Sequence, residues 1–99
     1  MRFEWGNSKL KRLFTEKVGA EAYPPNVVKA FYQRIEAVIA ARDERDLRAL
    51  KSLHYEKLKG SGERYSIRLN DQWRLEFERE KSQEGICLRV LEMSKHYGD

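Results

Sequence analysis

The sequence is poor in the residues that form disulfide bonds, metal sites and membrane spans. Cysteine occurs once, at Cys87, so no internal disulfide can form, and we expect a buried thiol in a reducing compartment. The two histidines, His54 and His96, lack the regular spacing of zinc ligands, so we expect neither a metal nor a cofactor. The longest apolar run, residues 37–41, is too short to cross a membrane, and the opening residues MRFEWGNSK lack the apolar core of a secretory signal. These absences predict a cytoplasmic protein with no membrane partner.

Two common kinds of catalytic motif are also missing. No glycine-rich loop opens a helix to hold phosphate, and the GSG at residues 60–62 predicts a hairpin turn instead. No nucleophile elbow surrounds a serine. Charge, by contrast, is abundant: 20 lysines and arginines stand against 16 acidic residues, for a net charge of +4. This balance suits an anionic partner, and a length of 99 residues predicts one domain spanning residues 1–99.

The strongest structural pattern is a β-hairpin in RYSIRLNDQWRLEF. Apolar and polar residues alternate in residues 64–70 and again in residues 73–81, which indicates two half-buried strands around a turn at Asn70-Asp71-Gln72. A loop centred on Asp71 puts all apolar side chains on one face by pairing Leu69 with Trp73, Ile67 with Leu75 and Tyr65 with Phe77. In this register Arg68 faces Arg74.

Like charges placed directly opposite each other destabilise a sheet, so the Arg68–Arg74 pair needs compensation. One explanation is local: Glu76 and Glu78 lie on the same face, or water solvates the arginines. The other is a bound polyanion, because a guanidinium group can hold phosphate with two parallel hydrogen bonds. The sequence leaves both explanations open.

Two helices are expected before the hairpin. After a short strand at residues 2–5, Asn7 or Ser8 can cap a helix that runs to about Val18 with that valine on its buried face. A second helix follows Pro24-Pro25, with Asn26 as its cap and an apolar stripe that extends to Ile39. The segment RDERDLRALKSL adds about one more helical turn.

Two further strands are expected around the hairpin, near residues 53–59 and 86–94. In the last strand Val90 and Met93 fall on opposite faces by simple alternation, which predicts a strand buried on both sides near the middle of the sheet. The fold class is therefore α+β, with two N-terminal helices packed on a small, curved, mainly antiparallel sheet. The even-numbered face of the hairpin is predicted to be uncovered.

Basic side chains and both histidines gather near strand ends. Metal-free RNA cleavage needs a base for the 2′-hydroxyl proton, cations for the negative charge at phosphorus, and an acid for the 5′-oxygen. Lysine, arginine, histidine, glutamate and tyrosine can fill these roles. The candidates are His54, Glu56, Lys57, Lys59, Arg68, Arg74, Lys95, His96 and Tyr97.

The segments SLHYEKLKG, YSIRLNDQWRLEF and the terminal KHY resemble the RelE/ParE toxin superfamily, and within it the HigB-like branch of plasmid maintenance system killer proteins. The resemblance covers nearly the whole chain. It implies the RelE-like microbial RNase fold and a toxin of a bacterial type II toxin-antitoxin system. Members of this branch are metal-independent endoribonucleases that cut mRNA in the A site of the 70S ribosome. The implied antitoxin is a helix-turn-helix, HigA-like protein.

The resemblance also assigns site residues. Lys59 and Arg74 match positions that handle the scissile phosphate, Gln72 matches a substrate-contacting position, and His96 matches the terminal histidine of the family. The expected catalytic residues are Lys59, Arg74, His96, Glu56 and His54. The expected RNA-binding residues are Arg68, Gln72, Lys57, Lys95 and Tyr97.

The chain departs from the family pattern at two positions. Glu56 stands where the branch has a histidine, and Lys95 stands where it has a tyrosine, with Tyr97 following instead. The general base is therefore either Glu56, or His54 if the strand bulges at residues 57–58.

Two other functions share this fold. A ParE-like toxin would poison DNA gyrase without cutting anything, and a non-catalytic module would bind RNA or protein through the same basic face. The combination of Lys59, Arg74 and His96 favours the nuclease, because a gyrase-binding surface needs no proton-transfer group beside a phosphate site.

Overall fold

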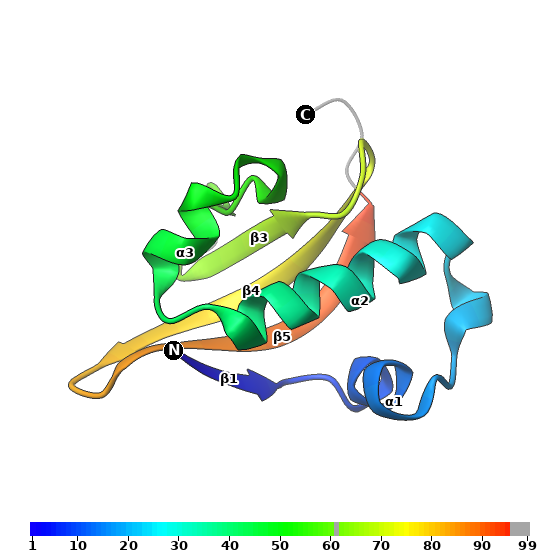
Figure 1. The fold of residues 1–99 in the computed structure, drawn as a ribbon, viewed down its shortest axis with the longest axis horizontal. Helices are drawn as coiled ribbons and strands as arrows, with labels where there is room; N and C mark the ends of the chain where they lie inside the picture. The colour runs from blue at the N-terminus through cyan, green and yellow to red at the C-terminus, as the bar shows by residue number, and fades with distance from the viewer. Residues whose placement is uncertain (61, 96–99) are drawn as a thin grey trace.

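The computed structural model describes residues 1–60 and 62–95, and these form helices packed against a single sheet (Figure 1). In chain order the elements are β1 (Arg2–Trp5), α1 (Ser8–Glu16), the 3-10 helix η1 (Ala20–Ala22), α2 (Pro25–Ala40), α3 (Glu44–Ala49), the 3-10 helix η2 (Lys51–Leu53), β2 (Glu56–Lys57), β3 (Arg64–Arg68), β4 (Trp73–Ser82) and β5 (Gly85–Lys95).

The sheet has the strand order β1-β5-β4-β3-β2. Strand β1 runs parallel to β5, and the other neighbours are antiparallel, so the sheet is mixed but mainly antiparallel. Helix α2 lies across one face of the sheet, while α1 lies beside β1 and α3 lies near β3 (Figure 1). The predicted α+β class is confirmed, and the third helical segment is the short helix α3.

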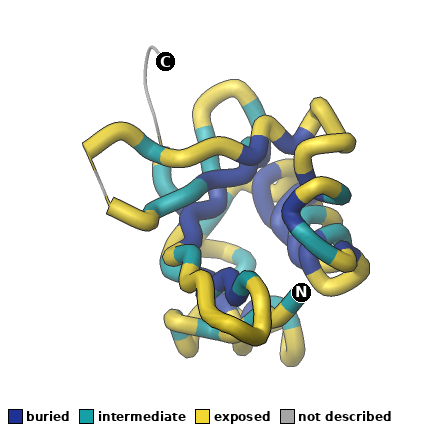
Figure 2. The backbone as a smooth tube through the Cα atoms, turned by 90° about the vertical axis from the view of Figure 1, so that its left-hand side faces the viewer, coloured by how far each residue is buried: buried dark blue, intermediate teal, exposed yellow. Residues whose placement is uncertain are grey.

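The core lies between α2 and the sheet. In α2 the buried apolar residues recur at helical spacing, and in the hairpin the odd-numbered residues Ile67, Leu75 and Phe77 are fully buried. Figure 2 shows buried stretches in the interior of the molecule and exposed residues along its loops and outer edges. Burial of this common apolar face holds α2 against the sheet.

The helix starts were predicted with mixed success. Asn7 caps α1 as expected, because its side chain accepts hydrogen bonds from the backbone N–H groups of Lys9 and Leu10 at 2.9 and 3.2 Å. The Asn26 cap is wrong. Pro24 occupies the cap position and helix α2 begins at Pro25, two residues earlier than an Asn26 cap implies. Proline suits the first position of a helix because its fixed φ is already helical and it lacks an N–H group.

Two residues assigned to the buried helix faces are exposed. Val18 lies beyond the end of α1, because Lys17 adopts a left-handed conformation with φ of 60° and ends the helix there. Ile39 is 53 % exposed because it lies at the margin of the apolar stripe rather than at its centre.

The predicted hairpin register is confirmed. Tyr65 pairs with Phe77, Ile67 with Leu75, and Arg68 with Arg74. The side-chain oxygen of Asn70 accepts hydrogen bonds from the backbone N–H groups of Gln72 and Trp73 at 2.9 and 2.8 Å, so Asn70 fixes the turn.

The strand expected near residues 53–59 is much shorter than predicted. Only β2, Glu56–Lys57, pairs with β3. Leu53 belongs to η2, and His54 adopts a left-handed conformation with φ of 46°, which an extended strand does not permit. The chain therefore turns sharply just before β2.

The last strand contains an irregularity that simple alternation does not predict. Glu76 pairs with Glu92 but Phe77 pairs with Val90, so β5 has one extra residue, Leu91. The bulge brings Val90 and Met93 onto the same face, and both are buried in the core. The strand has neighbours on both sides, and Cys87, on the other face from Leu88, is buried as predicted.

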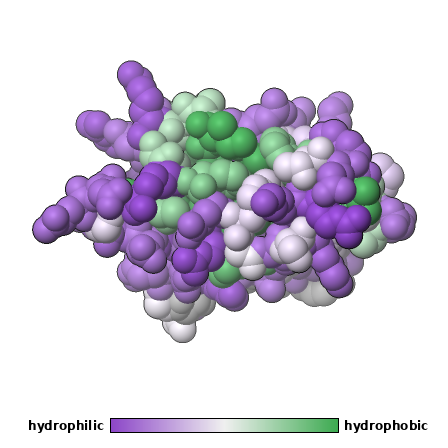
Figure 3. Space-filling view, turned by 90° about the horizontal axis from the view of Figure 1, so that it is seen from below, coloured by the Kyte–Doolittle hydropathy of each residue, from purple (hydrophilic) through white to green (hydrophobic). Residues whose placement is uncertain are grey.

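An aromatic cluster joins β1 to the helices. Trp5 contacts Phe3 and Phe14, with ring centroids 5.0 and 5.8 Å apart, and the Lys17 ammonium lies 3.8 Å from the centre of the Tyr32 ring. Figure 3 views the molecule from below, the side of β1 and α1 in Figure 1, and shows an apolar patch within a mostly hydrophilic surface. This cluster anchors the N-terminal segment to the core.

Candidate functional site

The polar face of the hairpin centres on Arg74. This residue lies on β4, between its partners Arg68 on β3 and Ser94 on β5. Its Nη1 donates hydrogen bonds to Glu56 Oε1 at 2.9 Å and to Ser66 Oγ at 3.2 Å. The structure therefore brings together two of the predicted catalytic residues, Arg74 and Glu56, from strands separated by β3.

The prediction that this face is uncovered holds towards its ends, where Arg64, Arg68 and Glu78 have side chains 38–54 % exposed, and is wrong at its centre. Ser66 is completely buried and Glu76 is only 5 % exposed, while the Arg74 side chain is 16 % exposed. Glu76 is ion-paired with Arg64 at 3.3 Å and accepts a hydrogen bond from the Ser94 hydroxyl. The polar side chains bury one another through hydrogen bonds and ion pairs, which the alternation pattern alone does not reveal.

The two opposed arginines have separate partners. Arg68 donates to the backbone oxygen of Asn70 from Nε at 3.2 Å and forms an ion pair with Asp71. Arg74 is instead ion-paired with Glu56. The expected compensation by nearby carboxylates is present, but it comes from Glu56 and Asp71.

The two carboxylates named in the sequence-based explanation have other partners. Glu76 is paired with Arg64, and Glu78 is paired with Arg89 at 3.3 Å. Neither carboxylate is ion-paired with Arg68 or Arg74 within the residues the structure describes. Whether a polyanion also binds the opposed arginines stays a prediction.

His54 is exposed between two open hollows. One, of about 390 Å³, is lined by His54, Glu56 and Arg48, among other residues. The other, of about 380 Å³, is lined by His54, Arg68 and Arg34, among others. Both candidates for the general base, Glu56 and His54, thus face the first hollow.

The remaining predicted residues are more scattered. Lys57 pairs in register with Tyr65, so it lies on the opposite face of β2 from Glu56, and it is ion-paired with Glu63 at 3.6 Å. Lys59 and Gln72 are exposed, one after β2 and one in the hairpin turn.

Lys95 lies at the end of β5, opposite Trp73. His96 and Tyr97 lie outside the described residues. The site assignments for these residues stay predictions.

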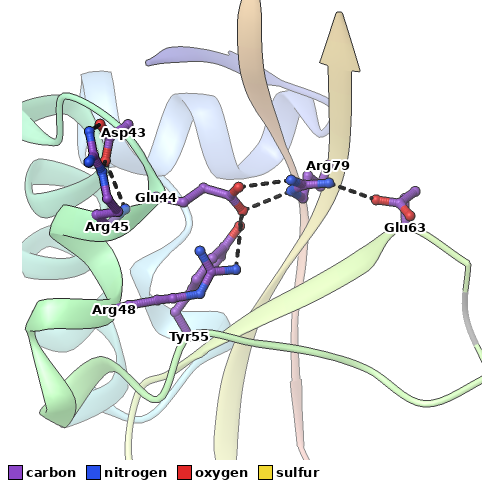
Figure 4. Close-up of polar contacts among 7 residues, drawn as sticks. All are labelled: Asp43, Glu44, Arg45, Arg48, Tyr55, Glu63 and Arg79. Carbon is purple, nitrogen blue, oxygen red and sulfur yellow. Dashed lines mark hydrogen bonds and ion pairs between the residues drawn. The ribbon is translucent and has the colours of Figure 1, made fainter.

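Sequence reasoning missed a buried ionic cluster on the other face of the sheet. Glu44, at the start of α3, is 8 % exposed and accepts hydrogen bonds from Arg79 Nε at 2.8 Å and Arg79 Nη2 at 2.9 Å. The Tyr55 hydroxyl donates to the same carboxylate at 2.6 Å, and Arg79 also reaches Glu63 at 3.1 Å (Figure 4). One signal was available: Arg79 continues the odd-numbered apolar face of β4, where a charge requires a buried partner.

The electrostatics of this cluster follow from these contacts. The hydrogen bonds from Arg79 lower the pKa of Glu44, against the opposing effect of burial. Burial, together with the hydrogen bond to Glu44, raises the pKa of Tyr55. The same contact with Glu44 raises the pKa of Arg79. Each group is therefore fixed in the protonation state it has at neutral pH, which suits a structural cluster rather than proton transfer.

Two other kinds of feature are absent from residues 1–60 and 62–95. No group of three or more histidine, cysteine or acidic side chains is placed to hold a metal ion there. Within the same residues, no helix combines the length and apolar character that a membrane crossing requires.

A solved structure identifies the fold. The YoeB/ParE toxin from Agrobacterium tumefaciens is similar with a TM-score of 0.53 and 19 % sequence identity, over 98 % of this chain and 100 % of that chain. At this identity the likeness shows that the two share a fold, which in this chain consists of helices packed on a five-stranded mixed sheet.

The sequence itself identifies the family. The family described as "RelE-like toxin of type II toxin-antitoxin system HigB" matches residues 3–88, so the chain belongs to the HigB-like toxin family. It is a toxin of a type II toxin-antitoxin system, and membership implies an antitoxin partner. No curated protein matches the sequence.

Proposed function

We propose that this toxin is a metal-independent, ribosome-dependent endoribonuclease that cuts mRNA in the A site of the 70S ribosome. The observation that carries the proposal is the Arg74–Glu56 pair, with a guanidinium and a carboxylate 2.9 Å apart on the polar face of the sheet. A cation for the phosphate and an acceptor for the 2′-hydroxyl proton are the two groups that the first step of metal-free RNA cleavage requires.

The step proceeds by general acid/base catalysis. Glu56 or His54 takes the proton from the 2′-hydroxyl, the 2′-oxygen attacks phosphorus, and the bond to the 5′-oxygen breaks. Arg74 and Lys59 stabilise the negative charge on the phosphate oxygens, and His96 gives a proton to the departing 5′-oxygen. Gln72, Lys57, Lys95 and Tyr97 contact the RNA.

The expected partners follow from this activity. The substrate is mRNA held by the ribosome, and the net charge of +4 suits a surface rich in RNA phosphates. The antitoxin is a helix-turn-helix, HigA-like protein, and the toxin acts in the cytoplasm.

The decisive experiment is primer extension on ribosome-bound mRNA after addition of purified toxin. Breaks at fixed positions within codons are expected with the wild-type protein and absent with Arg74→Ala. Arg45→Ala is the matched control, because Arg45 is an exposed arginine of α3 that is paired with the neighbouring Asp43. Intact mRNA accompanied by gyrase-trapped DNA breaks would establish the ParE-like activity instead, and intact mRNA and DNA would support a binding module.

The general base is identified by comparing Glu56→Gln with His54→Gln. Loss of the true base should lower the cleavage rate by about 10²- to 10⁴-fold. The other variant should retain activity within a few-fold. Equal activity in both variants would remove these two residues from the proposed mechanism.

A further inference from the structure

A second hollow lies at the end of β3, beside the turn of the hairpin. Its volume is about 380 Å³, and residues from separate elements line it: Arg34 of α2, Ser52 of η2, His54, and Arg68, Asn70 and Asp71 of the hairpin. Of these residues, His54 and Arg68 are among the predicted catalytic and RNA-binding residues, whereas Arg34 and Ser52 are not.

Two guanidinium groups meet at this hollow. The Nε of Arg34 donates a hydrogen bond to the backbone oxygen of Arg68 at 3.0 Å, which fixes the Arg34 side chain beside the end of β3. Burial lowers the pKa of Arg34, and the charge of Arg68 lowers it further. The fold therefore holds two like charges close together.

Little negative charge offsets this pair. Among the described residues, no carboxylate is ion-paired with Arg34, and Asp71 binds Arg68 from a side chain that is 90 % exposed. The lining also includes the Ser52 hydroxyl and the His54 ring, which are possible hydrogen-bond donors. This is a site with a surplus of positive charge and donors, as an anion requires.

We propose that this hollow is a second anion subsite, in which Arg34 and Arg68 bind an RNA phosphate next to the one at Arg74. The assignment rests on the proposed RNA substrate. In this proposal the two opposed arginines bind separate phosphates. Their side chains are held in different places, Arg74 by Glu56 on β2 and Arg68 by Asp71 in the turn.

The arrangement favours a polyanion over an isolated carboxylate. Arg68 and Arg74 are direct cross-strand partners, so their Cα atoms are roughly 4.5–5.5 Å apart. The two subsites therefore adjoin each other across the hairpin. A nucleic-acid strand carries phosphates at regular intervals and can occupy both subsites at once.

The test measures binding of a short, fully 2′-O-methylated RNA, which cannot be cleaved, over a range of salt concentrations. Arg34→Gln should weaken binding about 10-fold at low salt. It should also reduce the slope of log K against log salt by about 0.7, the value for one single-strand phosphate contact. Arg34→Lys should keep the slope but bind several-fold more weakly, because lysine lacks the planar fork.

Arg12→Gln is the control. Arg12 is an exposed arginine on α1 that is paired with Glu16, and it does not line the hollow. This variant should bind the RNA like the wild type. If Arg34→Gln does not fold, Arg34→Lys and Ser52→Ala test the hollow through a several-fold loss of affinity at an unchanged salt slope, because neither substitution removes a charge.

The outcomes separate this proposal from the proposed nuclease activity. Arg34-dependent RNA binding in a protein that cuts no mRNA would support the subsite and refute the nuclease. Cleavage by the wild type with unchanged RNA binding in all hollow variants would refute the subsite and keep the nuclease. If Arg34→Gln weakens binding of the antitoxin but not of RNA, the proposal is wrong, and the hollow instead binds a carboxylate of the antitoxin.

Discussion

Arginines occupy two regions of the sheet, and their surroundings differ in a way that separates structure from function. On one face, Arg79 is held by two carboxylates, Glu44 and Glu63. At the other face and the turn of the hairpin, Arg34 of α2, Arg68 and Arg74 have between them two ion-paired carboxylates among the described residues. These are Glu56 and Asp71, whose side chains are 52 % and 90 % exposed.

The comparison shows what a surplus of charge means in a small protein. A guanidinium whose donors are all occupied within the fold stabilises that fold and has little left to offer a ligand. Arginines that outnumber the carboxylates paired with them have N–H donors left for a ligand and produce a local excess of positive charge. These are the features that bind phosphate. The following predictions test this division, beginning with the largest expected effect.

Arg79→Gln should destabilise the protein by about 3 kcal/mol. The change leaves the buried Glu44 carboxylate without its main partner, and breaking one side of a buried pair costs about 3–5 kcal/mol. Urea denaturation measures the loss. Arg45→Gln, which removes the exposed partner of Asp43 in Figure 4, should leave the urea midpoint unchanged. Equal effects in the two variants would mean that the Arg79 cluster is not a structural centre.

Arg74→Ala should reduce cleavage by about 100-fold or more, the usual effect of removing one donor from developing negative charge. Its cost in stability should be near 1 kcal/mol, because buried Ser66 loses a hydrogen-bond partner. For a chain of this length that corresponds to a melting temperature lower by about 4–8 °C. A variant that keeps full activity would contradict the assignment of Arg74 to the phosphate.

Tyr55→Phe should cost about 1.5 kcal/mol in the free energy of unfolding, because the hydroxyl donates to a charged, buried carboxylate. The ring contact with Tyr65, at 5.3 Å, remains in the variant. The same substitution in an Arg79→Gln background should show strong coupling between the two sites, since both bind Glu44. Additive effects would show that the cluster does not act as a unit.

Acid unfolding should report on Glu44. Its pKa is lowered in the folded protein from an ordinary value of 4.5 by the Arg79 hydrogen bonds, so its contribution to stability is present above pH 4.5. That contribution is lost as the pH falls from 4.5 through the folded pKa, with a slope of at most ~1.4 kcal/mol per pH unit. Glu44→Gln should therefore show a shallower decline of stability in this range. If the wild type and Glu44→Gln lose stability with the same slope below pH 4.5, the contacts of Glu44 do not lower its pKa in the folded protein.

The elements that local patterns predicted well are those whose residues lie close together in the chain. Strict alternation determined the register of the hairpin, and the cap at Asn7 was visible beside the start of α1. The failures arise where a distant segment decides the outcome. The bulge at Leu91 depends on how β5 meets β4, and the length of β2 depends on how far it pairs with β3.

The candidate site likewise contains residues that the sequence identified and one that only the packing of the helices on the sheet revealed. The resemblance identified Arg74 and Glu56 as site residues, and the structure places them in contact. Arg34 could not be found from the sequence, because it lies on the polar side of a helix like any solvated arginine. Its role emerges only when α2 brings it to the backbone oxygen of Arg68, 34 residues further along the chain.

The sequence by itself determined that Arg68 and Arg74 stand opposite each other, because side chains in a strand alternate with a fixed period of two and the apolar set must share one face. The tertiary structure alone decided what each arginine binds. Glu56 reaches Arg74 from another strand, and Arg34 joins Arg68 from a helix. Such partners depend on packing between segments that no local pattern connects.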